Sequence, residues 1–197
     1  MIISLIGFMG CGKSSVGRRL SDLLCCPFMD LDEVIEQQSG RTIPEIFATD
    51  GEAAFRQMEL DALHSLISTE GMVEMGKEPC SATLILSLGG GTVMTPECAA
   101  LVQENTMCIY LRTSVDTLVA RLADEAAGRP LLSAGNVIPN GAEESTSHAM
   151  HLRSRIESLM SSRASVYERT ADIVIDTDNN TIDSVAQTLA KVVSANR

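Results

Sequence analysis

After its first methionine, the chain begins with Ile2-Ile-Ser-Leu-Ile6-Gly7-Phe-Met-Gly10-Cys-Gly12-Lys13-Ser14. The apolar run Ile2–Ile6 predicts a buried parallel strand. The residues that follow match the pattern G-x-x-x-x-G-K-[ST], whose glycines let backbone N–H groups surround a phosphate. A helix that starts at Lys13 would direct the positive end of its dipole toward the same phosphates. This stretch therefore predicts a strand, a phosphate-binding loop and a helix in succession.

Two side chains of this loop have chemical roles of their own. The Lys13 ammonium would bridge the β- and γ-phosphates of a nucleotide, and the Ser14 hydroxyl would ligate Mg²⁺. The alternative is an ordinary glycine-rich turn, which the strand before the loop and the helix after it make less probable. We expect the nucleotide to contact Gly10, Cys11, Gly12, Lys13, Ser14 and Ser15.

Strand-like and helical patterns alternate along the rest of the chain. Short apolar runs predict strands at Pro27–Leu31, Leu84–Leu88, Met107–Leu111 and Asp172–Asp176. Apolar periodicity and capping signals predict helices at Lys13–Leu24, Leu31–Ser39, 52–67, Ser114–Ala126, His151–Ala164 and Thr181–Val193, with further helix starts at Thr42 and Thr95. The alternation predicts one α/β domain over residues 1–197, with a parallel sheet and right-handed crossovers.

One segment, from Gly128 to about Met150, departs from this alternation. It contains Gly, Pro, Asn and Ser and has little periodicity. A loop of this length in a compact domain is usually a functional lid or a disordered insert. Arg129 stands at its start, and an arginine on a mobile lid can stabilise charge on a transferring phosphoryl group.

The composition excludes several classes of partner. Fifteen basic and 26 acidic residues give the 197-residue chain a formal charge of −11, which argues against a nucleic-acid or anionic-membrane surface. No apolar run approaches the roughly 20 residues of a membrane span. The six cysteines form no C-x-x-C pair and the N-terminus lacks a basic targeting segment, so we expect reduced thiols in the cytoplasm. His148 and His151 lack the further ligands of a metal site.

Two acidic residues follow the second predicted strand, in Phe28-Met-Asp30-Leu-Asp32. Ligands of α/β sheets bind at the carboxyl ends of the strands. If the strand continued through both residues, its period of two would point both carboxylates to one side. One could then hold Mg²⁺ through water, and the other could orient an acceptor hydroxyl or take its proton. The alternative is that Asp30 or Asp32 only caps the following helix.

Three further features allow both a functional and a structural interpretation. Arg56 and Glu59 lie three residues apart on one face of a predicted helix, either as part of a site or as an exposed ion pair. The stretch Gly89-Gly-Gly91 ends a strand, which indicates either close approach to a ligand or a flexible turn. Arg163, followed by Tyr167, is either a cation of the site or a solvated helix residue.

The order of these motifs resembles that of the shikimate kinases: phosphate-binding loop, Asp-x-Asp, Phe-Arg-x-x-Glu, Gly-Gly-Gly, Arg-Pro-Leu and Arg-x-x-x-Tyr. The resemblance extends from about Ile2 to Asp176. It implies that ATP, with Mg²⁺, phosphorylates the 3-hydroxyl of shikimate, on the route to chorismate and the aromatic amino acids. It also implies a monomer with a P-loop kinase fold, a three-layer α/β/α arrangement around a five-stranded parallel sheet with a mobile lid.

On the nucleotide side, the resemblance assigns Lys13 to the phosphates and Ser14 to Mg²⁺, with Asp30 reaching the metal through water. Arg129 matches the lid arginine on the phosphates. Arg121 resembles the arginine that lies against adenine, with one extra residue in its spacing to Arg129. The lid region is also longer than is usual in the family, with a polar insertion over residues 133–149.

On the acceptor side, the resemblance assigns Asp32 to the shikimate hydroxyls, as the residue that binds them and acts as base. Arg56 and Arg163 match the two arginines that grip the shikimate carboxylate. Gly90 and Gly91 match the backbone at the substrate hydroxyls.

Two other functions fit part of the pattern. A related kinase for gluconate or a nucleoside monophosphate would share the loop and the sheet, but Asp32 with two acceptor-binding arginines favours a polyhydroxy carboxylic acid. A nucleotide-dependent regulatory module would leave the aspartates, the arginines and the three glycines unexplained.

Overall fold

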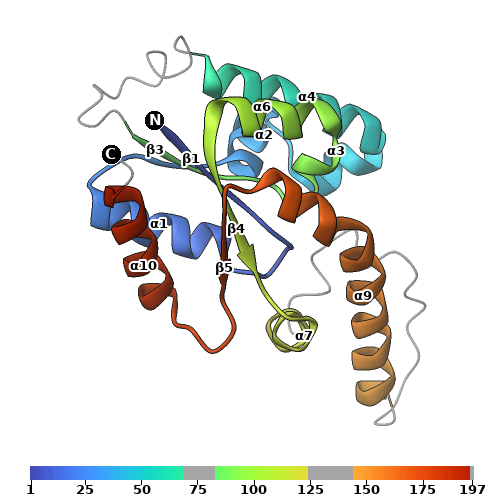
Figure 1. Cartoon of the computed structure of the whole chain (residues 1–197). Helices are drawn as coiled ribbons and strands as arrows, with labels where there is room; N and C mark the ends of the chain where they lie inside the picture. Colours follow the sequence, from blue (N-terminus) through green and yellow to red (C-terminus); the bar gives the residue numbers. More distant parts are fainter. Residues whose placement is uncertain (69–82, 124–143, 196–197) are drawn as a thin grey trace.

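The computed structural model describes residues 1–68, 83–123 and 144–195 (Figure 1). Five strands form one sheet in the order β2-β3-β1-β4-β5, and all four neighbouring pairs are parallel. The strands are β1 (Ile2–Ile6), β2 (Phe28–Asp30), β3 (Leu84–Ser87), β4 (Thr106–Arg112) and β5 (Ile173–Asp176). The predicted five-stranded parallel sheet is therefore confirmed, and each strand differs from its predicted bounds by at most one residue at either end.

The central strand β1 explains why the start of the chain is apolar. All five of its residues are buried, with β3 on one side and β4 on the other. Ile2 and Ile6 belong to the core on one face of the sheet, and Ile3 and Leu5 belong to the core on the other. A strand covered on both faces needs apolar side chains at successive positions, so its sequence is a continuous run and not an alternation.

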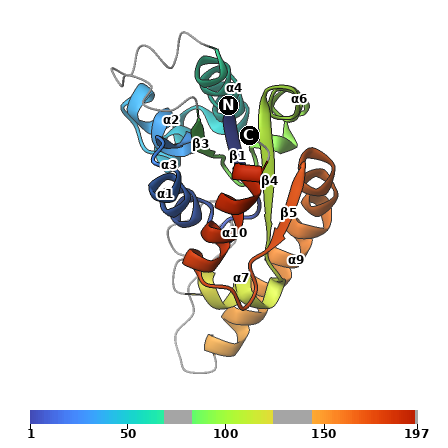
Figure 2. The same ribbon diagram turned by 60° about the vertical axis from the view of Figure 1, so that its left-hand side comes forward.

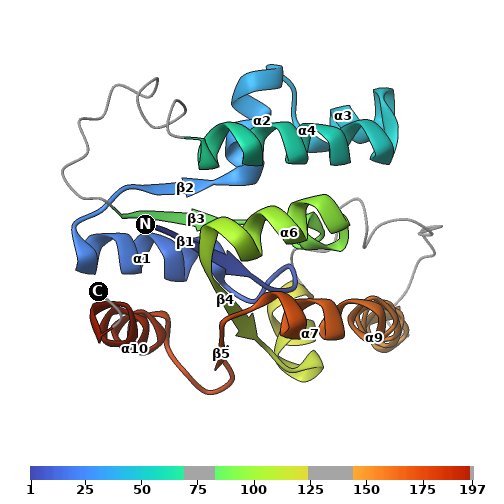
Figure 3. The ribbon, with the colours of Figure 1, turned by 45° about the horizontal axis from the view of Figure 1, so that its top comes forward.

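Helices cover both faces of the sheet and complete the predicted three-layer α/β/α arrangement (Figure 3). On one face lie α1 (Lys13–Leu24), α7 (Val115–Leu122) and α10 (Ile182–Ala195). On the other lie α2 (Leu31–Ser39), α3 (Ile43–Thr49), α4 (Gly51–Ile67), the short 3₁₀ helix η1 (Thr92–Met94) and α6 (Pro96–Asn105). Among the described residues, no helix combines the length and the apolar content needed to cross a bilayer.

The long helix α9 (Glu144–Thr170) differs from the sequence prediction at both ends. Residues 144–150, expected to be irregular, are helical. Their sequence, Glu-Ser-Thr-Ser-His-Ala-Met, has no apolar periodicity from which a helix could be predicted. Met150 is 68% exposed, and Leu152 is a buried residue of the core. At the other end, the buried Tyr167 continues the helix past Ala164.

The expected helix over Ser114–Ala126 is shorter in the described residues. Ser114 is the N-cap of α7 and accepts a hydrogen bond from the N–H of Thr117, and the helix ends at Leu122. Residues 128–143 of the lid predicted over 128–150, which include Arg129, lie outside the described residues, as do residues 124–126 of the predicted helix.

The start of β1 and the last turn of α10 lie at the same end of the molecule, as Figures 1 and 2 both show. This is the edge of the sheet where the parallel strands begin. The loop after β1 and the starts of α1 and α10 lie at the opposite edge, where the strands end.

Candidate active site

The loop between β1 and α1 has a backbone that only glycine adopts easily. Gly7, Gly10 and Gly12 have φ angles of 144°, 78° and 98°. A side chain at Gly10 would begin 2.8 Å from Leu122 of α7, so the loop needs glycine there for space as well. α1 begins directly after Gly12, which turns its N-terminal end toward the loop. The predicted succession of strand, glycine loop and helix is confirmed.

Lys13 is a buried cation whose head is held by the loop itself. Its Nζ donates to the carbonyl oxygens of Gly7 at 2.9 Å and Phe8 at 3.1 Å, and lies 3.9 Å from the buried Sγ of Cys11. These contacts fix a positive charge inside the curve of the loop.

Ser14 of α1 and Asp30 of β2 meet in a pair of hard oxygen donors. Ser14 Oγ donates to Asp30 Oδ2 at 2.6 Å, and Ser87 Oγ at the end of β3 lies 3.5 Å from Ser14 Oγ. Mg²⁺ in phosphate-transfer sites is usually held by one or two protein oxygens together with waters and phosphates. This donor set therefore fits Mg²⁺. The sequence interpretation missed Ser87, although its place before three glycines at a strand end was an available signal.

Asp30 also caps the following helix, which was the alternative interpretation of this residue. Its Oδ1 accepts the N–H of Asp32 at 3.1 Å and so caps α2. One carboxylate thus serves both the helix and Ser14. Because β2 ends at Asp30, the strand period does not align the two acids, and Asp32 instead reaches the same cavity from the first turn of α2.

Asp32 is a carboxyl group with a raised pKa. Burial, and after it the charges of Asp30 and Glu59, raise the pKa of Asp32 from 3.8 to about 6, although Lys13 acts in the lowering direction. A carboxylate with a pKa just below neutrality is ionised at pH 7 and still able to accept a proton.

Arg56 is held by a buried acid, so the interpretation as an exposed ion pair is wrong. Its Nη1 donates to Glu59 Oε2 at 2.5 Å, and its Nη2 donates to Glu52 Oε1 at 2.9 Å. Glu59 is only 1% exposed and also accepts the Thr92 hydroxyl at 2.5 Å. The sequence interpretation left Glu59 open between the site and an exposed ion pair and gave it no role, although its spacing of three from Arg56 was the signal that it orients the guanidinium.

The stretch Gly89–Gly91 lets functional side chains lie against the backbone. A Cβ atom at Gly89 would lie 2.9 Å from both Asp32 Oδ1 and Glu59 Oε1. A Cβ atom at Gly91 would lie 2.7 Å from Arg56 Nη2. A side chain at the middle glycine would begin 3.2 Å from the backbone nitrogen of Met9. Close approach, and not turn flexibility alone, therefore explains these glycines.

Arg163 and Tyr167 lie one turn apart on α9 and contact the same backbone oxygen. Arg163 Nη1 lies 3.5 Å from the carbonyl oxygen of Gly90, which also accepts the Tyr167 hydroxyl. Arg163 is 8% exposed, and its guanidinium carbon lies 5.9 Å from the centre of the Phe8 ring. The interpretation of Arg163 as a solvated helix residue is therefore wrong.

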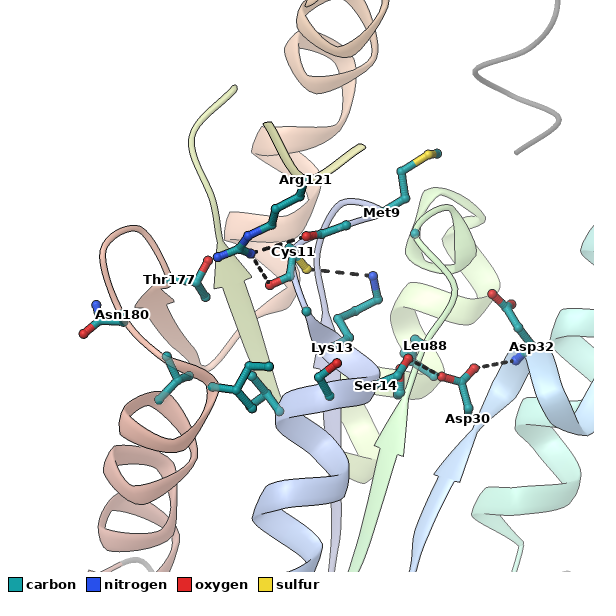
Figure 4. A pocket seen from close by; sticks show the side chains of 18 residues that line it. Met9, Cys11, Lys13, Ser14, Asp30, Asp32, Leu88, Arg121, Thr177 and Asn180 are labelled. Carbon is teal, nitrogen blue, oxygen red and sulfur yellow. Dashed lines mark hydrogen bonds between the residues drawn. The ribbon is translucent and has the colours of Figure 1, made fainter. Parts of the chain in front are cut away.

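A cavity of about 570 Å³ runs along the phosphate-binding loop (Figure 4). Asp30 and Asp32 lie at one end, and Arg121 of α7 lies at the other with Thr177 and Asn180 from the loop after β5. Arg121 Nη1 donates to the carbonyl oxygens of Gly10 at 3.3 Å and Cys11 at 3.2 Å. The sequence interpretation missed Thr177 and Asn180, because their loop carries no motif.

Most of the residues expected in the site line this cavity. They are Gly10, Cys11, Gly12, Lys13, Ser14, Ser15, Asp30, Asp32, Gly90 and Arg121. Arg56, Gly91 and Arg163 adjoin it through the glycine stretch. Arg129 lies outside the described residues.

Comparisons with known proteins agree on one family. The family model described as shikimate kinase matches residues 9–194. The shikimate kinase of Thioalkalivibrio sulfidiphilus is 36% identical over 194 residues, which are 98% of this chain and 87% of that protein. A shikimate kinase of Thermus thermophilus is 35% identical over 189 residues, which are 96% of this chain and 88% of that protein.

Solved structures give the same result. The structure of shikimate kinase from Acinetobacter baumannii in complex with shikimate has a TM-score of 0.80 and 28% identity, covering 100% of this chain and 94% of that one. Shikimate kinase from Aquifex aeolicus has a TM-score of 0.70 and 27% identity, covering 100% and 98%. With sequence and fold in agreement over almost the whole chain, this protein belongs to the shikimate kinase family, whose members transfer a phosphoryl group from ATP, with Mg²⁺, to a hydroxyl of shikimate.

Proposed function

We propose that the described cavity is where this chain transfers the γ-phosphoryl group of ATP to the 3-hydroxyl of shikimate. One observation carries the proposal: a single cavity joins the phosphate-binding loop, with Lys13, to Asp32, a carboxylate whose pKa is near 6. A phosphate anchor and a base in one cavity are what transfer to an alcohol requires.

The nucleotide would occupy the loop and the end of the cavity near α10. Lys13 would hold the β- and γ-phosphates, while Ser14 and Asp30 would hold Mg²⁺, which would neutralise charge on the phosphates. The end lined by Arg121 and Thr177 is left for the nucleoside, because Asp32 lies at the other end. Arg129 is assigned to the transferring phosphates by its motif alone.

The acceptor would lie beside Asp32 and the glycine stretch. Asp32 would take the proton of the 3-hydroxyl as its oxygen bonds to the γ-phosphorus and ADP leaves. Arg56 and Arg163 would bind the shikimate carboxylate, since guanidinium groups match carboxylate oxygens. Gly90 and Gly91 would present their backbone to the same ligand.

ADP release, measured with alternative acceptors, tests the proposed function. With ATP and Mg²⁺ present, we expect shikimate to stimulate release strongly, and gluconate and nucleoside monophosphates to have little effect. Equal release with and without shikimate, or a preference for another acceptor, would contradict the proposal.

The acceptor assignment is tested separately through Arg56→Ala. Loss of a charge-assisted carboxylate contact should weaken shikimate binding by about 10- to 100-fold, roughly 1.5–3 kcal/mol, with ATP affinity retained. Calorimetry measures both affinities. Arg41→Ala is the matched control, because Arg41 pairs with Asp50 at 2.6 Å in an exposed contact outside the cavity. Unchanged shikimate affinity in Arg56→Ala would refute the assignment.

We also propose that the protein works as a cytoplasmic monomer whose ligands are ATP and shikimate and do not include nucleic acid. Cys11, Cys25, Cys98 and Cys108 are free thiols, the state that a reducing compartment maintains, and the formal charge of −11 repels nucleic acid. The monomer is proposed from the resemblance to the family alone. Sedimentation equilibrium should give a mass near 21.1 kDa, and a mass twice as large would contradict the monomer.

A further inference from the structure

Gly90 contacts α9 and the phosphate-binding loop and also lines the cavity. Its carbonyl oxygen accepts the hydroxyl of Tyr167 and lies 3.5 Å from Nη1 of Arg163, both on α9. The same glycine packs so closely on the phosphate-binding loop that a side chain would begin 3.2 Å from the nitrogen of Met9. Gly90 itself lines the cavity. Tyr167 thus contacts the site without being part of the cavity wall described above.

The Tyr167 side chain is rigidly placed. It is fully buried, and its ring packs on Tyr110 of β4 with centroids 5.1 Å apart. Burial raises the pKa of its phenol well above the usual value, against the lowering effect of Arg163, so the hydroxyl keeps its proton and remains a donor. A fixed donor of this kind holds the oxygen that it faces.

Fixing one oxygen fixes the next N–H as well. A trans peptide is planar, and the carbonyl oxygen of Gly90 and the N–H of Gly91 point in opposite directions. No cis peptide occurs in the described chain, and no acceptor for the Gly91 N–H is found among those residues. Gly91 also lies against the Arg56 guanidinium, because a Cβ atom at Gly91 would lie 2.7 Å from Arg56 Nη2. The Gly91 N–H is therefore a donor beside a proposed carboxylate-binding arginine.

We propose that Tyr167 is a positioning residue for the acceptor. Its hydroxyl, by holding the Gly90 carbonyl, orients the Gly91 N–H and keeps the end of Arg163 beside the glycine stretch. This inference rests on the proposed roles of Arg163 and Gly91 in binding shikimate. In this proposal, the hydroxyl of Tyr167, and not its ring, affects shikimate binding.

Tyr167→Phe tests this assignment because it removes the hydroxyl and keeps the ring packed on Tyr110. We expect the KM for shikimate to rise about 3- to 10-fold, as for loss of one buried hydrogen bond, and the KM for ATP to stay unchanged. The matched control is Tyr110→Phe, in the same ring pair, whose hydroxyl makes no hydrogen bond among the described residues. It should leave both KM values unchanged.

A structural role alone would give a different pattern. If Tyr167→Phe lowers the midpoint of thermal unfolding but keeps the shikimate KM of the unaltered protein, or raises both KM values equally, the inference is overturned. Arg163→Ala separates this inference from the proposed function. If Arg163→Ala weakens shikimate binding and Tyr167→Phe does not, only the role of Tyr167 fails. If neither variant affects shikimate, the proposed acceptor site fails with it.

Discussion

Asp32 combines burial with neighbouring negative charge, and its titration should set the acid limb of the pH profile. With a pKa of about 6, it loses the ability to accept a proton as the pH falls below that value. We therefore expect kcat/KM for shikimate to fall about tenfold per pH unit below about pH 6, and Asp32→Asn to lower kcat by about 10²- to 10⁴-fold. Steady-state rates between pH 5 and 9 measure both. An acid limb centred near pH 4 would contradict this role.

The same carboxyl should make the fold less stable at neutral pH than in acid. The folded chain holds the Asp32 proton up to about pH 6, whereas the unfolded chain releases it near pH 3.8, so the stability that Asp32 contributes is lost as the pH rises through this window. Asp32→Asn should be more stable than the unaltered protein at pH 8, by at most about 3 kcal/mol, and equally stable near pH 3. Urea unfolding at the two pH values checks this, and a less stable variant at pH 8 would refute it.

Gly91 should matter to the acceptor and little to stability. In Gly91→Ala, the three atoms nearest to the new methyl group all belong to the Arg56 guanidinium, at 2.7–3.0 Å, the end of a flexible side chain. We expect the guanidinium to shift and the KM for shikimate to rise about tenfold, with the KM for ATP unchanged. Gly40→Ala is the control: Gly40 has φ +66° with open space around it, so the change should cost about 1 kcal/mol and leave both KM values unaltered. Equal loss of ATP affinity in Gly91→Ala would contradict the assignment.

Residue types and spacing predict the side chains that carry their own motif. Lys13 and Ser14 follow from the glycine loop, and Asp30 follows from a strand end. Ser87 and Glu59 lie within motifs but carry no role fixed by the motif, because their contacts with Ser14 and with Thr92 join different elements and only the structure shows them. The sequence presented the metal role and the helix-capping role of Asp30 as alternatives. In the structure both occur, because one carboxylate oxygen accepts from Ser14 and the other accepts from the N–H of Asp32.

The pair of helices α7 and α9 shows which contacts hold an element in place. Leu152 and Ile156 of α9 are buried in one core with Leu118 of α7. Leu152→Ala should therefore cost about 2–4 kcal/mol. Asp116→Asn removes an ion pair with Arg153 on the same two helices, whose side chains are 80% and 45% exposed, and should cost less than about 1 kcal/mol. Urea unfolding compares the two variants, and similar losses would contradict this ranking.

Elements in the core were predicted far better than those at its edge. The apolar runs of β1 and β3 mark strands buried on both faces, and the capping box at Thr42 and Glu45 places the start of α3. The start of α9 has no such signal, because residues 144–149 (Glu-Ser-Thr-Ser-His-Ala) contain no large apolar residue. A buried element needs apolar residues at regular positions, and this pattern can be recognised in the sequence. An exposed element does not need them and has no such pattern.

For the whole molecule, two cores share one sheet and should unfold together. β1 contributes Ile2 and Ile6 to one core and Ile3 and Leu5 to the other. We expect a single cooperative transition in urea, as for one domain. The chain has two tyrosines, both buried, and no tryptophan, so tyrosine fluorescence reports on the core while circular dichroism reports on the helices. Separate midpoints for the two signals would show independent units.

The placement of the chain ends has a practical consequence. β1 starts and α10 ends at one edge of the sheet, while the cavity lies at the other (Figures 1 and 2). α10 begins at the cavity with Ile182 and leads away from it for 14 residues, about 21 Å. A fusion tag, or attachment to a biosensor surface, at either end therefore leaves the ligand entrance facing bulk solution. A short linker between the two ends would also give a circular permutant, with new termini free to be placed elsewhere.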